Sequence, residues 1–252
     1  MDKPMKNIEE FYILGRPIET DIGILYPFKV KDYPEIMEHL GYITLSRGDI
    51  ILWLKRIAKE DENVKILIEL FKHITLYDFI IMFSSNEYED TILYQFYDGY
   101  KKTFEYCFKE DVFDKIQTSD NFEYYINLIR KVNDIQYEET VPNENIQRRN
   151  AIKRKLQEAK GEGIDFEAMY TSVEVATGKD VGDMTLYQFN RAFNRIWQFK
   201  NYDTTVLYAM LSSETDVEPW YKIFEEKTRE KNLITQKQLD DAIKNNGLTE
   251  KL

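Results

Sequence analysis

The clearest pattern of apolar and polar positions lies between residues 183 and 211. Apolar side chains recur there at the spacing of one face of an α-helix, and they are Leu186, Phe189, Phe193, Ile196 and Trp197. Thr185 precedes this stripe and Gln188 stands three residues later, which is the spacing of a capping box. Residues 201–203 interrupt the stripe, and Asp203 is suited to cap a second helix that carries Val206, Leu207, Met210 and Leu211. The pattern therefore predicts a helix–turn–helix pair whose apolar face needs a partner.

A shorter echo of this pattern occurs earlier in the chain. Residues 75–79 read TLYDF and residues 185–189 read TLYQF, while residues 88–94 (YEDTILY) are similar to residues 202–208 (YDTTVLY). The later copy has four extra residues between its two matches, about one helical turn, so the same face would still point inward. Two interpretations stay open. Either a helical hairpin was duplicated, which gives two related helical halves, or ordinary capping chemistry occurs twice by chance.

The remaining pattern predicts a mainly α protein, a multi-helix bundle with a small N-terminal β-hairpin. Two short apolar runs, at residues 11–14 and 22–26, surround Gly15, Pro17 and Gly23 and predict the hairpin. Asp32 is then expected to cap a short helix that ends at Gly41. Helical spacing follows almost continuously, over residues 49–59, 62–73, 75–108, 121–132, 144–160, 166–176 and from 218 onward.

Residues 134–143 mark the predicted domain boundary. They are polar, contain Pro142 and show no helical periodicity. We therefore expect a hairpin-plus-helical domain at residues 1–140 and a C-terminal helical domain at residues 141–225. The charged end, residues 226–252, is expected to form a solvated helix or a tail.

Composition narrows the classes of protein that fit. Hydrophobic residues make up 43% of the 252 positions and aromatic residues 14%, which predicts a folded chain. The 18 tyrosines and 15 phenylalanines exceed what a minimal core needs, so some tyrosines are expected at an interface. A net charge of −11 argues against nucleic acid and anionic membranes, and it suits a basic partner. Without a signal-peptide pattern or a long apolar run, the chain is expected in the cytoplasm.

No residue pattern points to catalysis, to a metal or to a cofactor. His39 and His73 lack a second ligand at zinc-site spacing, and the single cysteine, Cys107, lies among aromatic residues as a core thiol would. Phosphate-binding loops and hydrolase motifs are absent, and the 45 carboxylates are too many to single out a pair. We therefore expect that the protein is not an enzyme.

Two segments with basic residues could bind an acidic partner or DNA. The helix predicted over residues 144–160 carries Arg148, Arg149, Lys153, Arg154, Lys155 and Lys160, and it is either a patch for an acidic partner or a charged helix facing an acidic molecule. The helix–turn–helix at residues 183–211 could be read as a DNA-binding motif, but its second helix has no basic residue.

Two segments resemble tail assembly chaperones of tailed bacteriophages. Residues 15–36 (GRPIETDIGILYPFKVKDYPEI) are similar to the opening that precedes the helical body of those proteins, and residues 184–211 (MTLYQFNRAFNRIWQFKNYDTTVLYAML) are similar to their Leu-Tyr helix and the Tyr-Asp-initiated helix after it. The resemblance implies a mainly helical, non-catalytic protein of the host cytoplasm. Such chaperones coat the aggregation-prone tape measure protein until tail tube subunits replace them, and homo-oligomers are compatible with this role.

On this hypothesis an aromatic groove of paired helices binds the client. The expected binding residues are Tyr187, Phe193, Trp197, Tyr202 and Tyr208, with core packing as the alternative for each and as the expectation for at least half. Two other classes stay open: a structural virion component, such as an adaptor or tail-associated subunit, and an acidic phage inhibitor of a host protein.

Overall fold

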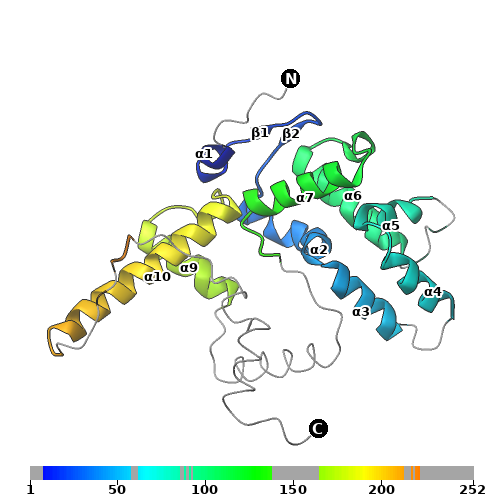
Figure 1. Ribbon diagram of the computed structural model, residues 1–252. Coiled ribbons are helices and arrows are strands. Elements are labelled where there is room, and N and C mark those ends of the chain that lie inside the picture. The colour runs from blue at the N-terminus through cyan, green and yellow to red at the C-terminus, as the bar shows by residue number, and fades with distance from the viewer. Residues whose placement is uncertain are drawn as a thin grey trace, which may run out of the picture. The chain divides into compact units, whose positions relative to one another are not determined.

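The computed structural model describes residues 8–57, 62–85, 88, 91, 93–137, 165–212, 217 and 219–221. Across these residues the protein is mainly α, with a small antiparallel hairpin near the N-terminus, which confirms the predicted fold class (Figure 1). The chain forms two compact units, Met1–Trp197 and Gln198–Leu252.

The N-terminal hairpin exists, but its first arm was predicted wrongly. Residues 11–13 belong to helix α1 (Ile8–Ile13), and the hairpin is formed by β1 (Ile18–Glu19) and β2 (Ile24–Leu25), with Ile18 opposite Leu25. Gly15 adopts a left-handed φ of 68°, and the Arg16 N–H donates to the Phe11 carbonyl at 2.8 Å. A glycine in this conformation ends a helix, so the strand can only begin after it.

Helix α2 (Tyr33–Thr44) follows the short 3₁₀ helix η1 (Val30–Asp32) and packs along α6 (Tyr94–Phe108). Gly41 was expected to end α2, but the helix continues through it, with the Thr44 hydroxyl donating to the Gly41 carbonyl at 2.8 Å. The glycine that matters for packing is Gly99, because a Cβ there would collide with the Tyr42 ring. The missing side chain lets α2 and α6 approach closely.

Helices α3 (Arg47–Ile57), α4 (Glu62–Phe71) and α5 (Leu76–Met82) enclose an apolar cluster. Its buried members are Ile50, Ile51, Leu54, Ile68, Phe71, Phe79, Phe83 and Phe96. A capping box starts α5: the Thr75 hydroxyl accepts from the Asp78 N–H at 3.1 Å, and the Thr75 N–H donates to Asp78 Oδ2 at 3.2 Å.

The larger cluster is built from rings on α6, the 3₁₀ helix η3 (Phe113–Lys115) and α7 (Ser119–Val132). Phe104 lies fully buried between Phe113, at a centroid distance of 5.5 Å, and Phe122, at 6.1 Å. Cys107 is also fully buried, and this burial raises the pKa of its thiol. The core role predicted for Cys107 is therefore confirmed.

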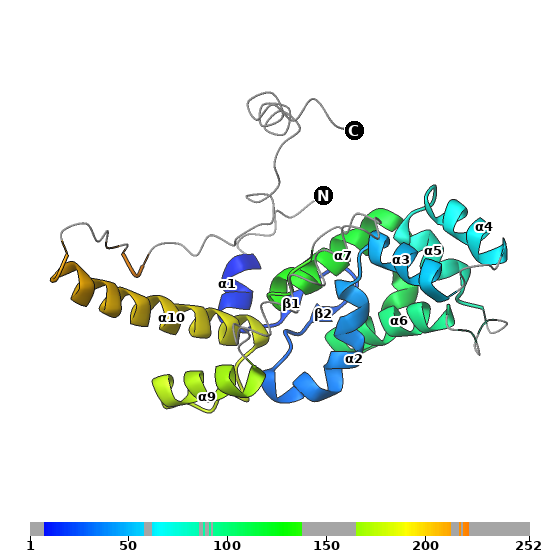
Figure 2. The same cartoon turned by 90° about the horizontal axis from the view of Figure 1, so that it is seen from below.

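Helix α9 (Phe166–Thr177) and the start of α10 (Leu186–Ala209) lie side by side in the first unit (Figure 2). The ring centroids of Phe166 and Phe189 are 5.8 Å apart. Backbone hydrogen bonds tie this part to the N-terminal segment: the Val30 N–H donates to the Met184 carbonyl and the Leu186 N–H to the Phe28 carbonyl, both at 2.9 Å. Residues 165–197 thus belong to the same compact unit as residues 8–137.

Helix α10 corrects the predicted helix–turn–helix pair. Residues 201–203 continue the helix, and the hydroxyls of Thr204 and Thr205 bond the carbonyls four residues earlier, at 2.9 and 2.7 Å. The stretch contains no glycine or proline, so nothing in it forces the backbone out of helical geometry. The two echoed segments therefore differ in structure, because α5 ends at Met82 while α10 runs without a break.

Several predicted features lie outside the described residues. They are the basic helix at 144–160 and the C-terminal segment 226–252, and the predicted boundary near residue 140 lies at the edge of the same gap. The division of the chain into three parts stays a prediction. Among the described helices, none combines the length and the apolar character needed to cross a membrane.

Candidate protein-binding surface

The start of α10 is fixed in the core of the first unit. The Gln188 N–H donates to the Thr185 hydroxyl at 3.2 Å and the Thr185 N–H donates to Gln188 Oε1 at 3.1 Å, so the predicted capping box is confirmed. Gln188 also donates through Nε2 to the Ile13 carbonyl at 3.1 Å. Leu186 and Phe189 are buried beneath these bonds. This end of the helix therefore has its apolar face covered.

Two of the residues expected to bind a client lie at this covered end. The Tyr187 ring packs on Tyr12 at a centroid distance of 4.8 Å, and the Arg191 guanidinium lies 5.1 Å from the centre of the Tyr187 ring. Phe193 is half-buried and packs against the larger core cluster. Both side chains pack against the core cluster, which is the alternative that the sequence left open for each of them, and their part in binding stays a prediction.

The other three expected residues differ in exposure. Trp197, the last residue of the first unit, is 62% exposed. In the second unit Tyr202 is half-buried, whereas Tyr208 is 63% exposed. Trp197 and Tyr208 are therefore the members of the expected set whose rings a partner can reach.

The second unit carries a group of exposed apolar side chains, and all but Phe199 belong to the face or the binding set predicted from the sequence. We call them the exposed α10 surface: Phe199, Leu207 and Tyr208 lie on α10, and Met210 and Leu211 directly follow its last residue. Leu211 is 86% exposed and Met210 77%. Leu186, Phe193 and Leu207 are separated by multiples of seven residues, about two helical turns each, as expected for positions along one continuous helix. The assumed break at residues 201–203 hid this continuity.

Further rings lie next to Phe199 in the second unit. The Trp220 ring is 5.1 Å from the Phe199 ring and 5.9 Å from the Tyr221 ring, measured between centroids. Trp220 is 41% exposed and Tyr221 67%. Large rings with a polar atom are enriched at protein interfaces, because they bury much apolar area with little loss of rotamer freedom.

The described residues do not form a candidate metal site that could compete with the protein-binding surface. No group of three or more histidine, cysteine, aspartate or glutamate side chains that could hold a metal ion occurs in the described part of the chain.

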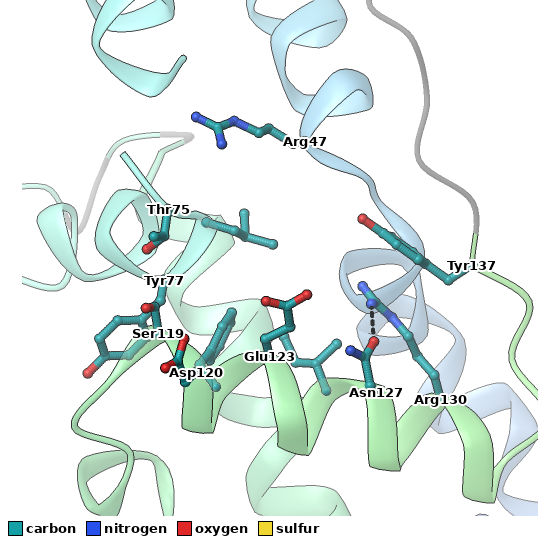
Figure 3. A pocket seen from close by; sticks show the side chains of 12 residues that line it. Arg47, Thr75, Tyr77, Ser119, Asp120, Glu123, Asn127, Arg130 and Tyr137 are labelled. Carbon is teal, nitrogen blue, oxygen red and sulfur yellow. Dashed lines mark hydrogen bonds between the residues drawn. The ribbon is translucent and has the colours of Figure 1, made fainter. Parts of the chain in front are cut away.

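The first unit also contains a pocket. It has a volume of about 650 Å³ and lies between the start of α3, the start of α5 and one face of α7, with Tyr137 at one side (Figure 3). Its polar lining includes two arginines, Arg47 and Arg130, and two carboxylates, Asp120 and Glu123. Sequence reasoning missed this pocket because its walls come from segments far apart in the chain.

Comparison with known proteins identifies two domain families. Residues 6–142 match the family described as the YomV N-terminal domain, and residues 155–225 match the YomV second domain. The chain is also 25% identical over 218 residues to the SPbeta prophage-derived uncharacterized protein YomV of Bacillus subtilis (strain 168), covering 86% of this chain and 88% of that protein. No solved structure matches. These similarities indicate a phage-derived protein, and none of them is described as a tail assembly chaperone.

Proposed function

Because the chain belongs to the YomV family, which includes a prophage-derived protein, we propose that it is a phage protein that binds another protein without performing catalysis. The observation that carries this proposal is the exposed α10 surface. Large apolar side chains that gather on a surface mark interaction sites more often than isolated ones do. Exposed apolar side chains at the end of a helix are suited to pack against a helix of a partner.

In its more specific form, the partner is a long helical client such as the tape measure protein, and the protein acts as a tail assembly chaperone in the host cytoplasm. Support comes from the resemblance of residues 15–36 and 184–211 and from charge. A net charge of −11 would keep a loaded complex in solution, since like charges oppose association between complexes. Tail tube protein is the alternative partner within the same assembly.

The test is co-expression with proteins from neighbouring reading frames, followed by affinity purification. The informative variant is Leu207→Asp/Leu211→Asp, which places charge in the exposed α10 surface. A matched control is Ile66→Asp, because Ile66 on α4 is 65% exposed, similar to Leu207 at 63%. We expect a long helical protein to co-purify with the wild type and the control but not with the double variant. Equal capture by all three proteins would overturn the proposal.

Two further measurements separate the specific role from its competitors. A chaperone is absent from finished virions, so mass spectrometry that finds this protein in purified particles would replace the chaperone with a structural subunit. Binding through an apolar surface should persist in 0.5 M salt (on the order of a 4–5 Å Debye length), whereas an acidic inhibitor bound in a basic groove would dissociate.

A further inference from the structure

The pocket of the first unit has an acidic side formed by one face of α7. Asp120, Glu123 and Asn127 follow one another at helical spacing and line the pocket. Figure 3 shows the Glu123 carboxylate reaching into the open space between Asp120 and Asn127. The acids therefore face a cavity.

The two arginines of the pocket are engaged by neutral groups of the protein. Arg130 is 6% exposed, and it donates through Nε to the Ile43 carbonyl at 2.7 Å and through Nη1 to Asn127 Oδ1 at 3.0 Å. Its guanidinium carbon lies 3.6 Å from the centre of the Tyr137 ring. Arg47 donates to the Phe71 carbonyl at the end of α4. Both cations therefore have interactions within the fold that hold them in place.

The two carboxylates have no such engagement. In the described part of the chain, neither the Asp120 nor the Glu123 carboxylate takes part in a hydrogen bond or an ion pair. Each can therefore accept hydrogen bonds from a ligand. A charge-assisted bond to a cationic donor is the strongest bond of this kind that a carboxylate can form.

The floor of the pocket is apolar. Phe122 and Ile126 are each 2% exposed, and Leu76 is half-buried beside them. The Tyr77 hydroxyl is already used, since it donates to the Ile116 carbonyl at 2.6 Å. Lysine and arginine bury their aliphatic stems on such a surface while the charged end reaches polar groups. The volume falls within the range of about 300–1,000 Å³ that is common for binding pockets.

We propose that this pocket binds a lysine or arginine side chain of a partner protein. The stem lies on Leu76, Phe122 and Ile126, and the charged end is held by Glu123 and Asp120. A chain with a net charge of −11 also attracts basic segments at long range. This inference rests on the proposed function in one respect, that the partner is a protein. The residues of the pocket are different from those of the exposed α10 surface.

The test uses small probes rather than the partner. N-acetyl-arginine amide is titrated into the full-length protein and followed by NMR, with N-acetyl-citrulline amide as the probe of similar shape without charge. We expect the arginine probe to shift the signals of residues 119–127 and the citrulline probe to leave them unchanged. Glu123→Gln should weaken binding about fivefold, and adding Asp120→Asn should abolish it. The control Glu167→Gln removes an exposed acid on α9 and should have no effect.

Three results would overturn the inference: equal binding of both probes, unchanged binding by the Glu123→Gln variant, or inorganic phosphate shifting the signals of Arg47 and Arg130 in place of the arginine probe. Urea unfolding of each variant checks that the fold is intact. The Leu207→Asp/Leu211→Asp variant should bind the arginine probe normally. Failure at the exposed α10 surface is thereby distinguished from failure at the pocket.

Discussion

The two ends of helix α10 carry the same kinds of side chain in opposite surroundings. Phe189, near the start, is 2% exposed, whereas Leu207, near the end, is 63% exposed. Both lie in one continuous helix, so helix propensity does not distinguish them. The difference comes from tertiary packing, because the core of the first unit covers side chains of α10 only as far as Ile196. Helical periodicity identifies an apolar face, but it does not say what covers that face.

The largest expected effect comes from truncating one side chain at each end. Phe189→Ala removes a buried ring from the core of the first unit and should lower the free energy of unfolding by about 3–5 kcal/mol. Leu207→Ala removes a mostly exposed side chain and should change it by less than about 0.5 kcal/mol. Urea unfolding followed by circular dichroism measures both. Similar losses for the two variants would show that the end of α10 is covered in solution.

A middle-sized effect is expected from the capping box at the start of α10. Thr185→Ala removes the acceptor of the Gln188 N–H and should cost about 1 kcal/mol. The matched control is Thr204→Ala, because Thr204 is exposed and its hydroxyl donates to the Lys200 carbonyl of its own helix, so it should contribute little. Equal losses of unfolding free energy in the Thr185→Ala and Thr204→Ala variants would show that the capping box does not stabilise the start of α10.

The smallest effect concerns Asp183, just before α10. Its hydrogen bond with Lys31, at 2.8 Å, and the nearby Lys29 lower the pKa of its carboxyl below the ordinary value. A lowered folded-state pKa adds stability above the unfolded pKa of about 3.9, and this stability is lost as the pH falls through the folded pKa. Because these side chains are exposed, the contribution is small.

An NMR titration of the Asp183 carboxyl measures this interaction. Lys31→Met should raise its pKa toward the ordinary value, and Lys102→Met, on α6, should leave it unchanged. An unchanged pKa in the Lys31→Met variant would show that the ion pair with Lys31 is not the cause of the lowered Asp183 pKa.

Local chemistry made part of the fold predictable. The capping box of Thr185 with Gln188 was predictable because it depends on residues only three positions apart. The errors arose where one residue type has several structural uses. Gly41 lies inside α2 although glycine often ends a helix, and residues 11–13 form α1 although a short apolar run is equally typical of a strand.

The candidate sites were less predictable because they depend on distant contacts. Trp197 and Tyr208 were named from their spacing, but nothing local separates them from Tyr187, whose ring is packed on Tyr12 from α1. The pocket needs Arg47 and Glu123 to meet, and no short-range pattern connects those positions. The sequence therefore indicates which side chains are chemically suited to binding. It does not indicate which of them the fold leaves exposed.

The backbone pairing of residues 28–31 with residues 182–186 has a consequence for how the chain can be divided. Main-chain hydrogen bonds and the buried Phe28, Val30 and Leu186 side chains join these segments without help from the peptide that links them in sequence. A cut introduced between residues 138 and 164 should therefore leave two fragments that stay associated. The protein then lends itself to fragment complementation, with each half expressed separately and the first unit restored on mixing.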